Sequence, residues 1–260
     1  VILHIPTILI IHKIRMADVI WRKRAVLFVL LFVPFVLQAK VYLVSVGIAD
    51  YPGRENDLYL PVNDAREITW LYRKSSQVTF CQLLDSEATV DNIVAAMNIF
   101  LLAKPDDIVV FYYSGHGYPG GLAVYDGCLS YVVIRAAMAK SKCKNKMIFS
   151  DACFAAGITM TSSSAQEEAQ QAEKANVMLF LSSRSNEYSL QNNDMKNAYF
   201  THFLQKGLRG GADANKDRVI TAKELFVFVY RRTVEKTAGQ QHPVMWGNFS
   251  DDMPVMIWKK

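Results

Sequence analysis

The sequence predicts an α/β fold built around a mostly parallel sheet of about six strands. Short apolar runs alternate along the chain with segments whose apolar residues recur at helical spacing. These runs are continuously apolar, which is typical of strands that are buried on both faces. The chain has 260 residues, of which 51% are apolar, and this is enough for a large domain with a packed core.

The expected elements follow one another in strand–helix order. Residues 41–46 (VYLVSV) form the first apolar run, and Pro61 opens the first helix, since proline is favoured in a first helical turn. Ile93, Met97 and Phe100 share one face of a second helix. The complete set comprises strands 41–46, 78–84, 108–113, 147–150 and 177–182, helices 61–73, 89–103, 131–140, 199–208 and 222–236, and terminal strands 242–246 and 255–258.

Residues 1–39 differ from the rest of the chain. Met16 precedes a basic segment (22–24, RKR) and a 13-residue apolar run (25–37). Gln38 and the small residue Ala39 follow this run. This order is typical of a secretory signal peptide, so we expect an exported protein whose mature domain is 40–260. An uncleaved anchor or an N-terminal core helix is the alternative. No run reaches the roughly 18 apolar residues of a membrane-spanning helix, so we expect no stable membrane span in the mature chain.

Charge and cysteine content exclude several functions. Residues 1–39 hold five of the 29 basic side chains and one of the 24 acidic ones, which leaves 24 basic and 23 acidic side chains in the remainder. We therefore expect no nucleic-acid partner. The four cysteines form no CxxC pair, which argues against a zinc site. A disulfide between Cys128 and Cys143 and free buried thiols stay open as alternatives.

Two motifs follow neighbouring strands of the predicted sheet. Residues 112–117 (YYSGHG) place His116 after the third strand, and residues 150–157 (SDACFAAG) place Cys153 after the fourth. Parallel sheets bind ligands at the carboxyl ends of their strands. A nucleophilic cysteine needs a nearby histidine to take its proton and to protonate the leaving group. Either motif alone is weak evidence, but together they indicate a cysteine–histidine site.

These motifs resemble those of the caspase/metacaspase superfamily of cysteine peptidases. The resemblance covers roughly residues 40–260 and includes VGIADYPG and VNDA near its start, and LSSRSNEYS, YFTHFL and QQHP later in the chain. It is closer to metacaspases and bacterial caspase-like proteins, because Asp151 lies where animal caspases have Gln. The resemblance implies a caspase-hemoglobinase fold, a three-layer α/β/α sandwich. It also implies a large-subunit-like part (40–158), a linker loop (159–176) and a small-subunit-like part (177–260).

The resemblance also implies roles for individual residues. Cys153 is the expected nucleophile and His116 its acid–base partner, while the backbone N–H groups of Gly117 and Cys153 form the oxyanion hole. Asp64 (in VNDA), Asp151 and Ser114 map onto a pocket that accepts Arg or Lys before the scissile bond. Two carboxylates in a confined pocket favour a cation, although Asp64 could instead be an acid stabilised by the helix dipole.

Two departures from the family pattern affect the pocket. Pro61 lies where metacaspases commonly have Cys, so we expect the pocket to differ in detail. Only 37 positions separate His116 from Cys153, against about 50 in caspases. The loop between them is therefore short, which could change the substrate groove.

A third motif spans residues 213–224 and resembles the calcium loop of an EF-hand. Arg218 replaces the usual Gly at its sixth position. The loop either binds calcium or caps the next helix without a metal. Its candidate ligands are Asp213, Asn215, Asp217, Val219 (through its carbonyl), Thr221 and Glu224.

Taken together, the sequence favours a secreted cysteine endopeptidase that cleaves proteins or peptides after Arg or Lys and needs no cofactor for its chemistry. A catalytically silent caspase-like binding module is one alternative, which the presence of both Cys153 and His116 disfavours. A clostripain- or gingipain-type relative is the other.

Overall fold

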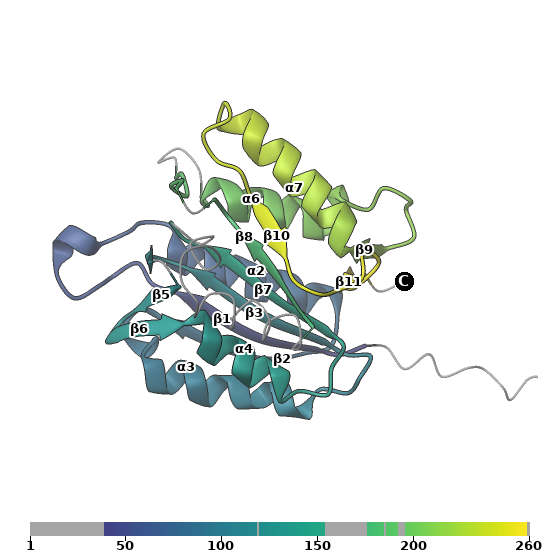
Figure 1. Cartoon of the computed structure of the whole chain (residues 1–260), viewed down its shortest axis with the longest axis horizontal. Coiled ribbons are helices and arrows are strands. Elements are labelled where there is room, and N and C mark those ends of the chain that lie inside the picture. Colours follow the sequence, from purple (N-terminus) through teal and green to yellow (C-terminus); the bar gives the residue numbers. More distant parts are fainter. Residues whose placement is uncertain (1–38, 119, 154–175, 185, 192–195, 259–260) are drawn as a thin grey trace, which may run out of the picture. The chain divides into compact units, whose positions relative to one another are not determined.

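A six-stranded sheet forms the centre of the computed structural model, which describes residues 39–118, 120–153, 176–184, 186–191 and 196–258 (Figure 1). Residues 39–260 form one compact unit. The strand order is β10-β8-β7-β3-β1-β2, and all neighbours are parallel except β10, which runs antiparallel to β8. The strands are β1 (Val41–Gly47), β2 (Val78–Leu84), β3 (Ile108–Ser114), β7 (Asn145–Asp151), β8 (Val177–Leu181) and β10 (Val244–Trp246). The predicted α/β fold with a mostly parallel sheet of about six strands is confirmed.

Helices cover both faces of this sheet and produce three layers (Figure 1). One face packs against α3 (Val90–Ala96), its 3-10 extension (Met97–Leu102) and α4 (Tyr131–Ala139). The other face packs against α2 (Pro61–Ser75), α6 (Tyr199–Lys206) and α7 (Ala222–Lys236). A π-helical turn (Gly207–Gly211) continues α6.

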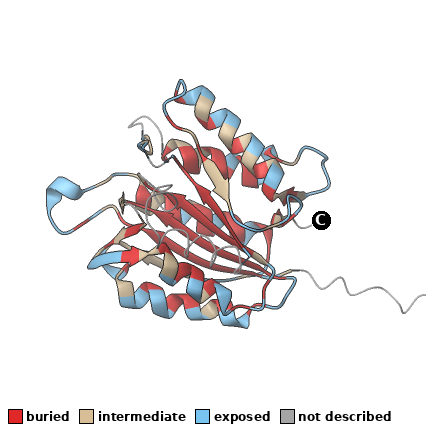
Figure 2. Ribbon diagram, viewed as in Figure 1, coloured by how far each residue is buried: buried red, intermediate tan, exposed pale blue. Residues whose placement is uncertain are grey.

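Each central strand contributes side chains to both cores, as the continuously apolar runs indicate. In β1, Tyr42 and Val44 belong to the core under α3 and α4, whereas Val41 and Leu43 belong to the core under α2 and α7. Figure 2 shows the central strands β1, β3, β7 and β8 as buried, whereas the edge strands β2 and β10 are partly exposed and the helices are buried mainly on their inner sides. Such two-sided burial holds the carboxyl ends of the strands in fixed positions, and the candidate site lies there.

Two small sheets were not predicted. One contains β4 (Gly117–Tyr118), β5 (Gly121–Val124) and β6 (Gly127–Ser130), which directly follow the His116 motif. The other pairs β9 (Val219–Thr221) with β11 (Pro254–Ile257), so the expected strand at 255–258 exists but lies outside the central sheet. Single-turn 3-10 helices also form at Arg54–Asn56 and Asp85–Glu87.

Two predictions concern segments outside the described residues. They are the leader, nearly all of which (1–38) is undescribed, and the linker 159–176, of which only Asn176 is described. Within the described part of the chain, no helix is long and apolar enough to cross a membrane.

Candidate active site

The two motifs that are predicted to be catalytic meet at the carboxyl edge of the central sheet. Strands β3 and β7 pair in parallel register, with Ser114 opposite Asp151. The pairing continues past the strands, because the N–H of Gly115 donates to the carbonyl of Asp151 at 3.2 Å. A Cβ atom on Gly117 would lie 2.4 Å from the carbonyl oxygen of Cys153. Only glycine allows the two backbones to come this close, so the residue after His116 lies against the predicted nucleophile.

The imidazole of His116 is held from two sides. Its ring nitrogen Nε2 lies 2.8 Å from the carbonyl oxygen of Asn56. Because a carbonyl can only accept, Nε2 carries the hydrogen, and in the neutral ring Nδ1 is then the nitrogen that can take a proton. The Tyr51 ring lies 4.9 Å from the imidazole, and its hydroxyl accepts the backbone N–H of His116 at 2.8 Å. The Tyr113 hydroxyl donates to the His116 carbonyl at 2.7 Å.

Cys153 is a half-buried thiol directly after β7. Burial raises its pKa, the nearby Asp151 carboxylate raises it further, and the backbone amide of Ser189 opposes this rise. The preceding residue is fixed as well, because Ser182 Oγ accepts from the N–H of Ala152 at 3.2 Å and donates to its carbonyl at 3.0 Å. Since a raised pKa keeps the resting sulfur protonated, attack on a substrate requires a base beside it.

Asp64 lies in the first turn of α2 and is completely buried. The helix starts close over the sheet, because a Cβ on Gly47 would lie 2.4 Å from the carbonyl of Pro61. Ser114 Oγ donates to one Asp64 carboxylate oxygen at 2.9 Å, and Asn197 Nδ2 donates to the other at 2.7 Å. Burial first, and then the charge of Asp151, raise the pKa of Asp64 well above its usual value.

Asp151 is the second buried carboxylate of this region. The hydroxyls of Ser189 and Thr201 donate to its two oxygens at 2.5 and 2.7 Å, and the Thr201 N–H donates at 3.1 Å. Burial raises its pKa, and these hydrogen bonds oppose the rise. No cationic side chain of the described residues contributes to the pKa of either Asp64 or Asp151. Among the described residues the pair therefore forms an acidic site without a counter-ion, and a ligand cation would relieve the repulsion between the two carboxylates.

His116 and Gly117 also line a hollow of about 420 Å³. Its walls come from the loop after β1 and from the small sheet β4–β5–β6. The lining residues carry no charged side chain apart from the imidazole when it is protonated, and Asp64 and Asp151 are not among them. Tyr51, Pro52, Asn56, Val124, Tyr125 and Cys128 are among its lining residues.

Oxygen atoms of the predicted calcium loop bond mainly to the loop itself. The Asp213 carboxylate accepts the N–H groups of Asp217 and Arg218 at 3.2 and 3.0 Å. Glu224 accepts the N–H and hydroxyl of Thr221 at 3.0 and 2.9 Å, and so caps α7. The φ angle of Arg218 is 72°, in the left-handed region that EF-hand loops usually fill with glycine. Of the other two candidate ligands, Asn215 donates to the Asp217 carboxylate, and Val219 is the first residue of β9.

No group of three or more acidic, histidine or cysteine side chains is arranged to hold a metal ion within the described ranges. Calcium binding stays a prediction. The observed contacts of Glu224 are those of the alternative, in which the loop caps α7 without a metal.

All four cysteines are free thiols, so the disulfide considered between Cys128 and Cys143 is not formed. Cys143 is buried and donates to the Asp107 carbonyl at 2.9 Å, whereas Cys128 is exposed.

Sequence reasoning missed the residues that surround the predicted ones. They share one feature, which is that each supplies a hydroxyl, an amide or a carbonyl to His116 or to one of the two buried acids. Several lie in segments that carried the resemblance, including ADYPG, NEYS and YFTHFL, but hydroxyls and amides are too common for their partners to be predicted. They are Tyr51, Asn56, Ser189, Asn197 and Thr201.

The structure thus places a histidine and a cysteine at the ends of adjacent parallel strands, as expected for a cysteine hydrolase. The chain belongs to the caspase-domain family of peptidases, whose model matches residues 41–253. That family consists of cysteine peptidases.

Solved structures show the same fold. Caspase-1 from Spodoptera frugiperda is similar with a TM-score of 0.59 and 16% identity, over 86% of this chain and 91% of that one. A protein from Geobacter sulfurreducens is similar with a TM-score of 0.57 and 16% identity, over 80% of this chain and 92% of that one. A search of curated proteins found no significant match.

Proposed function

We propose that the chain is an exported cysteine endopeptidase that hydrolyses peptide bonds after Arg or Lys. The observation that carries this proposal is the in-register pairing of β3 and β7, which brings the His116 and Cys153 motifs into contact at one edge of the sheet. Membership of a peptidase family supports the reaction class, and the signal-peptide pattern of residues 1–39 supports export.

In the proposed reaction, Nδ1 of His116 takes the thiol proton as the Cys153 sulfur attacks the scissile carbonyl carbon. A C–S bond forms, and the carbonyl oxygen becomes an oxyanion that the N–H groups of Gly117 and Cys153 would stabilise. His116 then gives its proton to the leaving amine as the C–N bond breaks. Water, activated by the same imidazole, hydrolyses the resulting thioester and restores the thiol.

The substrate preference rests on Asp64 and Asp151. Both carboxylates are buried, hydrogen-bonded and without a protein cation among the described residues. A guanidinium or ammonium group would supply the missing positive charge, whereas an Asp side chain would add a third negative charge and be rejected. Because His116 protonates the leaving amine, the hollow beside it would receive the residue after the scissile bond.

Two alternatives differ from this proposal, the first in its activity and the second in its ancestry. A catalytically silent binding module would bind peptides in the same groove without cutting them. A clostripain- or gingipain-type relative would show a similar basic preference, so it differs in ancestry more than in chemistry. Retention of both Cys153 and His116, with the imidazole fixed by Asn56, favours the active peptidase.

A peptide library tests the proposal. We expect purified wild-type protein to cleave after Arg and Lys, and Cys153→Ala and His116→Ala each to lower kcat by at least about a thousandfold without unfolding the protein. Cys81→Ala is the matched thiol control, because Cys81 lies on the edge strand β2, away from the site. Cleavage mainly after Asp would contradict the pocket assignment, and full activity of Cys153→Ala would contradict the mechanism.

A further inference from the structure

Gln241 lies in the QQHP motif, which the proposed reaction leaves without a role. Its side chain is completely buried. The amide nitrogen Nε2 donates to the carbonyl of Ser182 at 2.9 Å and to the hydroxyl of Ser189 at 3.3 Å, while Oε1 accepts the N–H of Leu190 at 3.0 Å. One buried amide thus connects Ser182, directly after β8, to Ser189 and Leu190 further along the chain.

The first arm of this network leads to the nucleophile. Ser182, whose carbonyl accepts from Gln241, also bonds through its hydroxyl to both the N–H and the carbonyl of Ala152. Ala152 is the residue directly before Cys153. Gln241 is therefore connected to the backbone of Ala152 through one intervening residue, Ser182.

The second arm leads to the acidic pocket. The Ser189 hydroxyl accepts from Gln241 and donates to the Asp151 carboxylate. The backbone amide of the same serine lies beside the Cys153 sulfur. Ser189 is thus the one described residue whose side chain holds the pocket carboxylate while its backbone faces the nucleophile.

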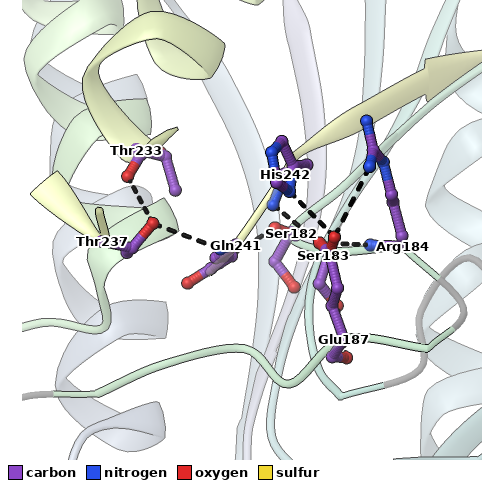
Figure 3. Close-up of polar contacts among 8 residues, drawn as sticks. All are labelled: Ser182, Ser183, Arg184, Glu187, Thr233, Thr237, Gln241 and His242. Atoms are coloured by element: carbon purple, nitrogen blue, oxygen red, sulfur yellow. Dashed lines mark hydrogen bonds and ion pairs between the residues drawn. The ribbon is translucent and has the colours of Figure 1, made fainter. Parts of the chain in front are cut away.

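Gln241 is itself anchored. Its N–H donates to the Thr237 hydroxyl at 3.2 Å, which in turn donates to the carbonyl of Thr233 in α7 at 2.8 Å (Figure 3). The neighbouring His242 also bonds to the segment after β8. Its N–H and its ring nitrogen Nδ1 lie 2.7 and 2.8 Å from the oxygens of the Glu187 carboxylate (Figure 3). The segment after β8 is held at two adjacent points against the start of β10.

We propose that Gln241 is a positioning residue for this site and acts through Ser189, which sets the orientation of the Asp151 carboxylate for a basic substrate side chain. This inference rests on the proposed function. Without the Ser189 hydroxyl, Asp151 keeps only the Thr201 donors. The carboxylate then turns more freely and holds a proton more readily, so it attracts a cation less.

The matched substrates are two fluorogenic peptides that end in Arg or in citrulline, the neutral isostere of Arg. Loss of pocket orientation lowers the ratio of kcat/KM for Arg over citrulline, whereas general damage to the fold lowers both values together. We expect Ser189→Ala to lower this ratio roughly ten- to hundredfold, the range for a hydrogen bond to a charged group, and Gln241→Leu to lower it roughly two- to tenfold, the range for a hydrogen bond between neutral groups. Ser189→Thr, which keeps the hydroxyl, restores most of the ratio.

Gln240→Leu is the matched control, because Gln240 is exposed and adjacent and the substitution is the same. Its ratio equals that of the wild type. Ser189→Ala keeps the test decisive if Gln241→Leu does not fold. An unchanged Arg-to-citrulline ratio in Ser189→Ala overturns the inference while the peptidase proposal stands. A wild-type protein that cleaves neither peptide overturns both.

Discussion

At the scale of single residues, the site contains two buried acids that no described side chain neutralises. Asp64 and Asp151 both have raised pKa values because of burial, and Asp151 adds to the rise at Asp64. A group whose pKa is higher in the folded protein favours folding at acidic pH, and this contribution is lost as the pH rises towards the folded pKa. The two acids therefore cost stability at neutral pH, which is typical of a site kept for function.

This cost predicts that Asp64→Asn is more stable than the wild type at neutral pH. Asparagine can still accept from Asn197 and donate to the Ser114 hydroxyl, so the contacts remain while the buried charge is lost. We expect a rise in Tm of roughly 2–4 °C, the shift that about 1 kcal/mol produces in a chain of this size. The difference should shrink towards acidic pH, where Asp64 of the wild type is protonated. Thermal unfolding at several pH values measures it, and a lower Tm at neutral pH would count against the account.

A second prediction concerns the thiol. The Asp151 charge raises the pKa of Cys153, so Asp151→Asn should lower that pKa. Because iodoacetamide reacts with the thiolate, the pH profile for alkylation of Cys153 should move to lower pH in the variant. The rate can be followed by intact mass, with Cys153→Ala to identify the labelled residue. A profile that moves to higher pH would contradict the assigned influence of Asp151.

At the scale of elements, long apolar segments were predictable and short ones were not. Strand β2 was predicted with its observed bounds, and α7 likewise, because each has enough residues to show burial or helical spacing. Strand β4 has two residues and β9 three, too few to show a period. Their strand conformation depends on partners elsewhere in the chain.

The residues of the site also fall into those that motifs predicted and those that they did not. His116, Cys153, Ser114, Asp64 and Asp151 could be named from motifs. The carbonyl of Asn56 that orients the imidazole could not, because any residue type supplies a carbonyl and this one is 60 residues away in the sequence. Contacts that depend on backbone groups or on common hydroxyls need the three-dimensional structure.

The loop from Asp213 to Glu224 carries the element-scale prediction of calcium binding. The left-handed Arg218 gives the loop a turn at the position where EF-hand loops turn. Glu224 would have to exchange its capping bonds to Thr221 for the metal. We expect calorimetry to detect binding at roughly millimolar calcium, as in weak extracellular sites, and Glu224→Gln to abolish it. Absence of heat in the wild type would leave Glu224 with its capping role alone.

At the scale of the whole molecule, the composition of the linker predicts that the chain can cleave itself. The linker 159–176 is rich in Ser, Gln and Glu and contains one basic residue, Lys174. An enzyme that cuts after Arg or Lys could therefore cleave itself there, with a new N-terminus at Ala175. We expect this terminus in wild-type protein after incubation and its absence in Cys153→Ala. Equal cutting of both proteins would identify another protease as the cause.

The leader makes a further prediction about the whole chain. If residues 1–39 contain a signal peptide, protein exported by a suitable host should begin at Lys40. Intact-mass measurement reads this directly. A mass that still includes residues 25–37 would indicate an anchor instead.

The central claim is that Cys153 is a nucleophile beside a pocket for a basic side chain. The most direct measurement is labelling with two thiol-reactive peptide probes that differ only in ending in Arg or Asp, followed by intact mass. The account predicts that the Arg probe adds one label to the wild type and none to Cys153→Ala, while the Asp probe adds none. Labelling of Cys153→Ala by the Arg probe, or faster labelling of the wild type by the Asp probe, would contradict it.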